Sequence, residues 1–135
     1  MKSCYCCSGI AYKKCCQSYI SGISKPKTAV ALMRSRFTAF ALRKDNYIKK
    51  TAAPPVSEMF IDLDLSNDAR VWVDLKILDK KLGGVSDDYG EVEFKAGYKL
   101  NPDSSEILYF QERSIFKKIN NRWYYSEHKH TNPNN

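Results

Sequence analysis

The chain has 135 residues, a hydrophobic fraction of 43% and a formal net charge of +7 at pH 7. This composition supports one ordinary hydrophobic core, with room for a small appendage. No apolar run approaches the roughly 20 residues that a bilayer-spanning helix needs, and no apolar stretch follows Lys2 as it would in a secretory signal. The sequence therefore predicts a soluble, cytoplasmic protein without a transmembrane segment.

The positive charge is concentrated in the first part of the chain. Residues 1–50 contain eleven lysines and arginines and one acidic residue, whereas residues 51–135 contain eleven basic and fourteen acidic residues. Such asymmetry can mark contact with an anionic partner, for example RNA, an acidic lipid or an acidic protein. A solvated basic face is the alternative interpretation, and charge alone does not separate the two.

All five cysteines lie within the first sixteen residues, at positions 4, 6, 7, 15 and 16. Disulfides are disfavoured, because adjacent cysteines bridge poorly and five is an odd number. A redox pair of Cys4 and Cys7 lacks the surrounding βαβ pattern. Metal binding remains as the main interpretation, and unpaired reduced thiols are its alternative.

Four thiolates would form a closed shell that suits zinc, with iron as the alternative metal. Ser8-Gly9 supplies a turn between the two halves, since glycine accepts a positive φ without strain. A closed shell leaves no position for water or substrate, so the site is predicted to be structural. The predicted ligands are Cys4, Cys6, Cys15 and Cys16.

The spacing C-x-C-x(8)-C-C, with Ser8-Gly9 and Tyr12-Lys13-Lys14 inside it, resembles the SEC-C motif. That zinc-binding segment also occurs at the C-terminal tail of the SecA translocation motor. The resemblance implies docking on a partner such as the SecB chaperone, the ribosome or an anionic lipid surface. Two positions depart from the usual motif: Tyr5 replaces a proline, and Cys7 replaces a glycine and becomes a surplus thiol.

Residues 21–27 are small, polar and interrupted by Gly22 and Pro26, which predicts a loop. Thr28 is a suitable N-cap for the helix expected over residues 28–48. Its apolar positions recur at helical spacing, at Val30, Met33, Phe37, Phe40 and Ala41. The polar side of this helix is predicted to carry Arg34, Ser35, Thr38 and Lys44. Residues 51–67 have no clear assignment, although Pro54-Pro55 must end any helix.

The second half changes to strand-like alternation. In residues 70–78, Val71, Val73, Leu75 and Ile77 are predicted to form the apolar face. Residues 91–100 and 106–119 read as two further strands, and Gly97 suggests a bulge or bend in the first of them. Asn120-Asn121 predicts a tight hairpin into a fourth strand over residues 122–127. Residues 128–135, including His128 and His130, are expected to form a polar, solvated tail.

A helix followed by about four antiparallel strands predicts an α+β fold. The stretches TAVALMRSRFTAFALRKDNYI, LKILDKKLGG, GEVEF and QERSIFKKINNRWYY resemble the YchJ-like bacterial family. The resemblance implies a nuclear transport factor two-like, or cystatin-like, cone: a helix-covered, curved antiparallel sheet that encloses a pocket. The implied organisation is a metal-binding motif over residues 1–22, the cone over residues 23–127 and the tail.

Two classes of function follow. In the first, the protein is a non-enzymatic interaction protein whose basic, N-terminal metal-binding motif docks on a protein or nucleic-acid partner. In the second, the pocket binds a small molecule and acts as an isomerase- or hydrolase-type enzyme. Glu112 is its candidate acid or base, because the strand pattern places this carboxylate among apolar residues. Arg113, which is adjacent, and Arg34 or Arg36 of the helix are its candidate partners, although a glutamate paired with an arginine is more often structural.

Overall fold

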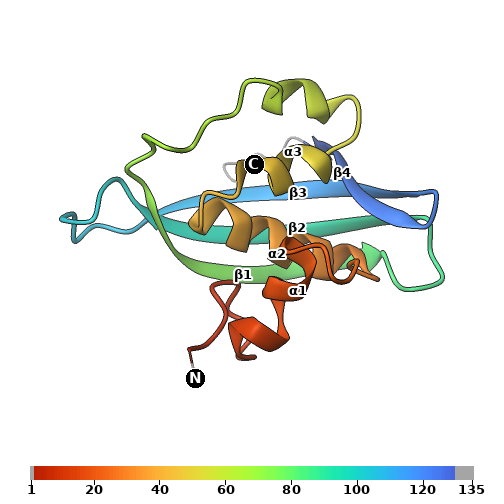
Figure 1. Cartoon of the computed structure of the whole chain (residues 1–135), viewed down its shortest axis with the longest axis horizontal. Helices are drawn as coiled ribbons and strands as arrows, with labels where there is room; N and C mark the ends of the chain where they lie inside the picture. The colour runs from red at the N-terminus through yellow and green to blue at the C-terminus, as the bar shows by residue number, and fades with distance from the viewer. Residues whose placement is uncertain (1, 130–135) are drawn as a thin grey trace.

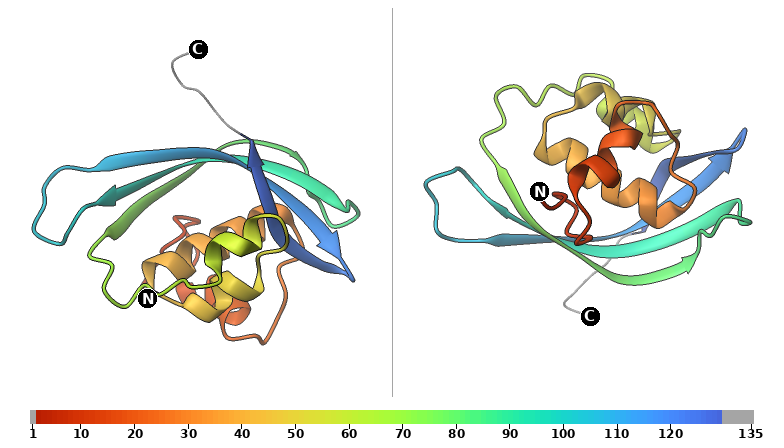
Figure 2. Two further views of the ribbon diagram at one scale, coloured as in Figure 1. Left: turned by 90° about the horizontal axis from the view of Figure 1, so that it is seen from above. Right: turned by 60° about the horizontal axis from the view of Figure 1, so that its bottom comes forward.

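The computed structural model describes residues 2–129, which form a curved four-stranded sheet with helices on its concave face (Figures 1 and 2). The strand order is β1-β2-β3-β4, and every neighbouring pair is antiparallel. This arrangement confirms the predicted α+β, nuclear transport factor two-like fold. Within the described residues, no helix has the length and apolar character needed to cross a membrane.

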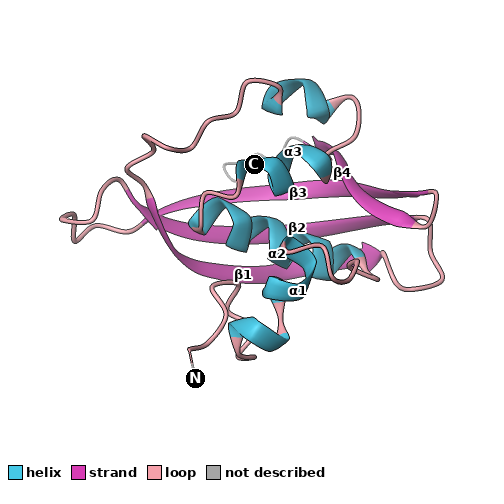
Figure 3. Cartoon of the chain, viewed as in Figure 1, coloured by secondary structure: helices cyan, strands magenta, loops and turns pink. Residues whose placement is uncertain are grey.

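The elements follow one another as helices first and strands second (Figure 3). The helical elements are η1 (Tyr12–Lys14), α1 (Cys16–Ile20), α2 (Ala29–Ala41), α3 (Asp45–Lys50) and η2 (Val56–Phe60). The strands are β1 (Val71–Leu82), β2 (Tyr89–Lys99), β3 (Leu108–Ile119) and β4 (Arg122–Lys129). The knuckle formed by residues 2–20 lies beside α2, near the β1 edge of the sheet (Figure 2).

Helix α2 begins as predicted, because the Thr28 side chain accepts a hydrogen bond from the backbone N–H of Ala31 at 3.1 Å. The single long helix predicted over residues 28–48 is wrong. The chain leaves the helix after Ala41 and turns at Arg43, whose φ is 57°, before α3 begins. This break folds α3 back so that it packs against α2.

The predicted polar side of α2 is also partly wrong, since Ser35 and Thr38 are buried. The Ser35 hydroxyl lies 2.7 Å from the Tyr47 hydroxyl of α3, and it donates to the Leu32 carbonyl at 2.8 Å. Thr38 lies against the N-terminal knuckle, 3.7 Å from the Cys4 sulfur. Both polar side chains can be buried because their hydroxyl groups form hydrogen bonds inside the fold, where α2 is covered on more than one side.

The apolar face of β1 differs from strict alternation. A register shift between Trp72 and Asp74 marks a bulge, which turns Trp72 inward and leaves Val73 exposed. Asp74 pairs with Gly97 of β2, where an added Cβ would lie only 3.2 Å from the Asp74 Cβ. Gly97 therefore lies at a bulge, as predicted, but the extra residue is Val73 of the neighbouring strand β1.

The turn between β3 and β4 is the predicted tight hairpin. Asn120 and Asn121 have φ values of 51° and 66°, the left-handed conformation that asparagine tolerates. Strand β4 extends to Lys129, so His128 lies in the sheet opposite Ser114 rather than in a tail, contrary to the prediction. The rest of the predicted tail, including His130, lies outside the described residues.

The segment between α3 and β1 is fastened to β4. The backbone N–H of Tyr125 donates to the Thr51 carbonyl at 2.9 Å, and the N–H of Ala53 donates to the Tyr125 carbonyl at 2.8 Å. Helix η2 follows and faces the concave side of the sheet, with Phe60 next to Tyr125. The segment that the sequence left unassigned thus forms one wall of the interior.

Candidate functional site

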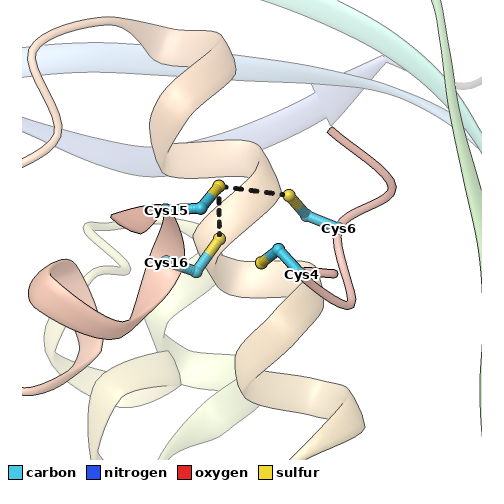
Figure 4. Close-up of side chains that lie close together, drawn as sticks. All are labelled: Cys4, Cys6, Cys15 and Cys16. Atoms are coloured by element: carbon cyan, nitrogen blue, oxygen red, sulfur yellow. Dashed lines mark hydrogen bonds between the residues drawn. The ribbon is translucent and has the colours of Figure 1, made fainter. Parts of the chain in front are cut away.

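The four predicted metal ligands converge at the N-terminus (Figure 4). Their sulfur atoms all lie within 4.8 Å of one another. The Cys6 and Cys15 sulfurs are 3.6 Å apart, and the Cys15 and Cys16 sulfurs are 3.8 Å apart. All five cysteines are free thiols, and Cys4, Cys6 and Cys16 are buried.

Local backbone geometry brings the two halves of the cluster together. The Cys4 N–H donates to the Ile10 carbonyl at 2.8 Å, which closes a loop over residues 4–10. Cys7 and Gly9 take left-handed φ values of 62° and 84° inside this loop. The chain then passes through η1, so that Cys15 and Cys16 at the start of α1 face Cys4 and Cys6.

Cys7 stays outside the cluster. Its side chain is exposed, and its sulfur lies 3.9 Å from a carboxylate oxygen of Asp74. The sequence marked Cys7 as surplus, and the fold directs it away from the other four sulfurs.

Helix α2 supports the cluster from the main domain. Arg34 Nη1 donates to the Cys6 carbonyl at 2.6 Å, and the Thr38 hydroxyl lies beside the Cys4 sulfur. Arg34 was a candidate for the pocket, but the structure places its guanidinium at the knuckle. Thr38 was missed as a site residue, because a threonine in a helix carries no metal-binding signal of its own.

The donor set fits a tetrahedral thiolate site. Four sulfurs that each lie about 2.3 Å from one metal ion are separated by about 3.8 Å, close to the two distances given above. The pKa of Cys6 is lowered to about 4, mainly because the neighbouring Cys16 thiol donates a hydrogen bond that stabilises the Cys6 thiolate. Burial raises the pKa of Cys15. The cluster could therefore hold a metal ion, which would stabilise the remaining thiolates.

The second candidate region is the interior of the cone. A cavity of about 370 Å³ lies between α2, η2 and the concave face of the sheet. Glu112 reaches it from β3 together with Phe110, Ser114 and Phe116, the face that the sequence predicted. One Glu112 oxygen, Oε2, accepts hydrogen bonds from the Ser114 hydroxyl at 2.5 Å and the Tyr125 hydroxyl at 2.8 Å.

Arg113 does not accompany Glu112 into the cavity. Adjacent strand residues point to opposite faces, and Arg113 forms ion pairs on the convex face with Glu91 at 2.6 Å, Asp79 at 2.8 Å and Glu93 at 3.3 Å. Hydrogen bonding from Arg113 lowers the pKa of Glu91 to about 2. These contacts hold Arg113 on the face of the sheet away from the cavity.

Arg36 is the arginine that lines the cavity. Its Nη1 donates to the Ile48 carbonyl at 2.7 Å and to the Thr51 hydroxyl at 2.6 Å. The guanidinium carbon lies 5.0 Å from the ring centre of Tyr125 and 5.2 Å from that of Phe60. Burial lowers the pKa of Arg36 to about 10, so the side chain remains charged at neutral pH.

Comparison with known proteins links both regions to one family. A family model described as "YchJ, middle NTF2-like domain" matches residues 28–128. A UPF0225 protein of Pectobacterium carotovorum is 35% identical over 131 residues, covering 96% of this chain and 84% of its own. A UPF0225 protein of Corynebacterium glutamicum is 38% identical over 125 residues, covering 93% of this chain and 94% of its own.

Two solved structures resemble the whole chain. One is the solution structure of RPA3114, a SEC-C motif containing protein from Rhodopseudomonas palustris, with a TM-score of 0.79 and 29% identity over 96% of this chain and 98% of that one. The other is the crystal structure of a SEC-C motif containing protein from Psychrobacter arcticus, with a TM-score of 0.74 and 28% identity over 98% of this chain and 85% of that one. The similarity therefore extends through the knuckle as well as the cone.

Proposed function

Since the chain belongs to the YchJ family of proteins with an NTF2-like domain, we propose that its SEC-C-type knuckle holds a structural zinc ion and docks on an acidic partner surface. The protein is then an interaction module rather than an enzyme. The convergence of four cysteine sulfurs within 4.8 Å of one another is the observation that carries this proposal.

Zinc is the proposed metal, with iron as the alternative. Four thiolates favour zinc or iron over magnesium, calcium or manganese, which prefer oxygen ligands. Cys4, Cys6, Cys15 and Cys16 would fill a tetrahedral shell and leave no position for water. The metal would therefore shape the knuckle without activating a nucleophile.

The metal also gives the knuckle a defined surface. A segment of about twenty residues buries too little apolar area to fold by itself, so metal binding supplies part of its folding free energy. The knuckle also shares a core with α2, since Cys4, Cys6 and Cys16 pack in one cluster with Leu32 and Phe37. A partner would therefore meet a knuckle held rigidly on the cone.

Charge favours an acidic partner. Five exposed lysines lie in or next to the knuckle: Lys2, Lys13, Lys14, Lys25 and Lys27. The SecB chaperone is our first candidate for the acidic protein, and a ribosomal RNA surface is the nucleic-acid alternative. Both would bind through charge complementarity, which weakens as salt concentration rises.

The metal proposal is tested by elemental analysis of protein purified without added metal. We expect one zinc per chain, which is lost in the Cys4→Ser, Cys6→Ser, Cys15→Ser and Cys16→Ser variants. Cys7→Ser is the matched control and should retain the metal, because Cys7 lies outside the cluster. Metal-free native protein, or equal loss in the Cys7 variant, would refute the assignment.

The docking proposal is tested by binding to immobilised SecB and to ribosomes. The double variant Lys13→Glu/Lys14→Glu should lose binding, while Lys80→Glu/Lys81→Glu should not. The control changes the same number of charges in another pair of adjacent, exposed lysines, on β1. Equal effects of the two double variants would mean that general charge, and not the knuckle, drives association.

A reaction in the cavity around Glu112 remains a prediction. The carboxylate does line a cavity, and of the three arginines considered beside it Arg36 lines the same cavity. Arg34 lies at the knuckle and Arg113 on the convex face.

A further inference from the structure

The cavity of the cone lies apart from the four sulfurs, and none of its lining residues belongs to the knuckle. Its volume of about 370 Å³ lies within the range of small-molecule sites. The walls are mostly aromatic, with Phe37, Phe40, Phe60, Trp72, Phe94 and Phe116 among the lining residues. Such a space suits one flat apolar group that carries a short polar end.

A buried cation faces this apolar space. Arg36 is only 5% exposed, and within residues 2–129 it forms no ion pair with a carboxylate. Burying a charge without a charged partner is costly, so a fold rarely keeps one without a use. Phe60 and Tyr125 hold the guanidinium in place by cation–π contact.

Arg36 has hydrogen-bond donors to spare. Its interactions with described residues use Nη1 alone, which leaves Nε and Nη2 free. Throughout the described part of the chain, no side-chain nitrogen or oxygen that is sealed from solvent lacks a partner. The free N–H groups must therefore border accessible space, and the space that Arg36 lines is the cavity.

Glu112 offers the complementary acceptor. Its Oε2 atom is occupied by Ser114 and Tyr125, whereas Oε1 accepts no hydrogen bond from residues 2–129. By the same reasoning as for Arg36, Oε1 borders accessible space. The Tyr125 side chain touches both groups, because its ring faces Arg36 and its hydroxyl donates to Glu112.

The charges of the cavity balance. Arg36 and Glu112 carry one charge of each sign, and the third charged side chain of the lining, Arg70, is paired with Asp68 at 2.7 Å. A ligand with a net charge would upset this balance in a low-dielectric space. An uncharged polar end that accepts from Arg36 and donates to Glu112 would satisfy both.

We propose that this cavity binds a small, uncharged aromatic molecule whose polar end places a carbonyl oxygen on Arg36 and an N–H group on Glu112, as a carboxamide does. The aromatic body lies among the phenylalanines, where it is removed from water. The two hydrogen bonds to charged groups orient the ligand and select against charged analogues.

Three probes with one ring and different ends test the proposal: phenylacetamide, phenylacetate and phenethylamine. Each is titrated into the ¹⁵N-labelled protein and followed by two-dimensional NMR. We expect saturable shifts at the amides of Phe94, Ser114 and Phe116, with phenylacetamide binding about tenfold tighter than either charged probe, the effect of one hydrogen bond to a charged group. This comparison needs no variant.

The Glu112→Gln variant then tests the assigned acceptor. It keeps the side-chain shape but removes the negative charge, so we expect phenylacetate to become the tightest of the three. Glu106→Gln, an exposed position outside the lining, should keep the original order. The proposal is overturned if a charged probe binds the native protein more tightly than phenylacetamide, or if phenylacetamide shows no saturable binding up to its solubility limit. It is also overturned if the shifts lie outside the cavity, or if the order of affinities is unchanged in Glu112→Gln.

Discussion

Replacing Arg34 by methionine should weaken metal binding at the knuckle, although Arg34 is not a predicted ligand. Its guanidinium donates to the Cys6 carbonyl at 2.6 Å and so holds one ligand loop against α2. A hydrogen bond from a charged donor contributes about 1.5–3 kcal/mol, which corresponds to roughly a 10- to 150-fold change in an equilibrium constant. Loss of supporting contacts around metal ligands commonly costs a similar factor of about 10–100.

The assay is competition for zinc against a chromophoric chelator of known affinity. Arg43→Met is the matched control, because Arg43 Nη2 also donates to a backbone carbonyl at 2.6 Å, that of Asp68, away from the cysteines. We expect the Arg34 variant to lose about tenfold or more in zinc affinity and the Arg43 variant to match the native protein. Equal affinities in all three proteins would refute the reasoning that α2 stabilises the knuckle.

Three further predictions concern the cone. Phe116→Ala should lower the free energy of unfolding by about 3 kcal/mol in urea titrations, because a buried ring is removed beside an existing cavity, whereas the exposed Ile119→Ala should change it little. The pKa of Glu91 falls from 4.5 to about 2 on folding, so the stability that this carboxylate contributes is complete above pH 4.5 and is lost as the pH falls toward 2. Glu91→Gln should therefore flatten the loss of stability across that interval in unfolding curves measured from pH 5 to pH 2. Asn121→Val should lower the melting temperature, since its φ of 66° costs a β-branched residue about 1–2 kcal/mol, and an unchanged value would show that the hairpin rearranges freely.

The sequence by itself determined the features that depend on short-range geometry. Crowding of the cysteines within sixteen residues indicated the knuckle, because ligands so close along the chain need only a tight loop to meet. Thr28 as a helix cap, Asn120-Asn121 as a turn and the strand over residues 91–100 were predictable for the same reason. In each case the conformation follows from a few neighbouring residues.

Only the tertiary structure decided which side of each element meets which partner. A prediction from helical periodicity supposes that a helix has one buried face, but α2 packs against the sheet, α3 and the knuckle. Ser35 and Thr38 are therefore buried, and Arg34 reaches the Cys6 carbonyl. The bulge opposite Gly97 turns Trp72 toward the interior and leaves Val73 exposed, which is the opposite of the predicted alternation. Two arginines of the same helix, Arg34 and Arg36, lie on different faces and therefore serve different sites. Sequence patterns record polarity, whereas the direction and partner of a side chain depend on contacts between segments that are distant along the chain.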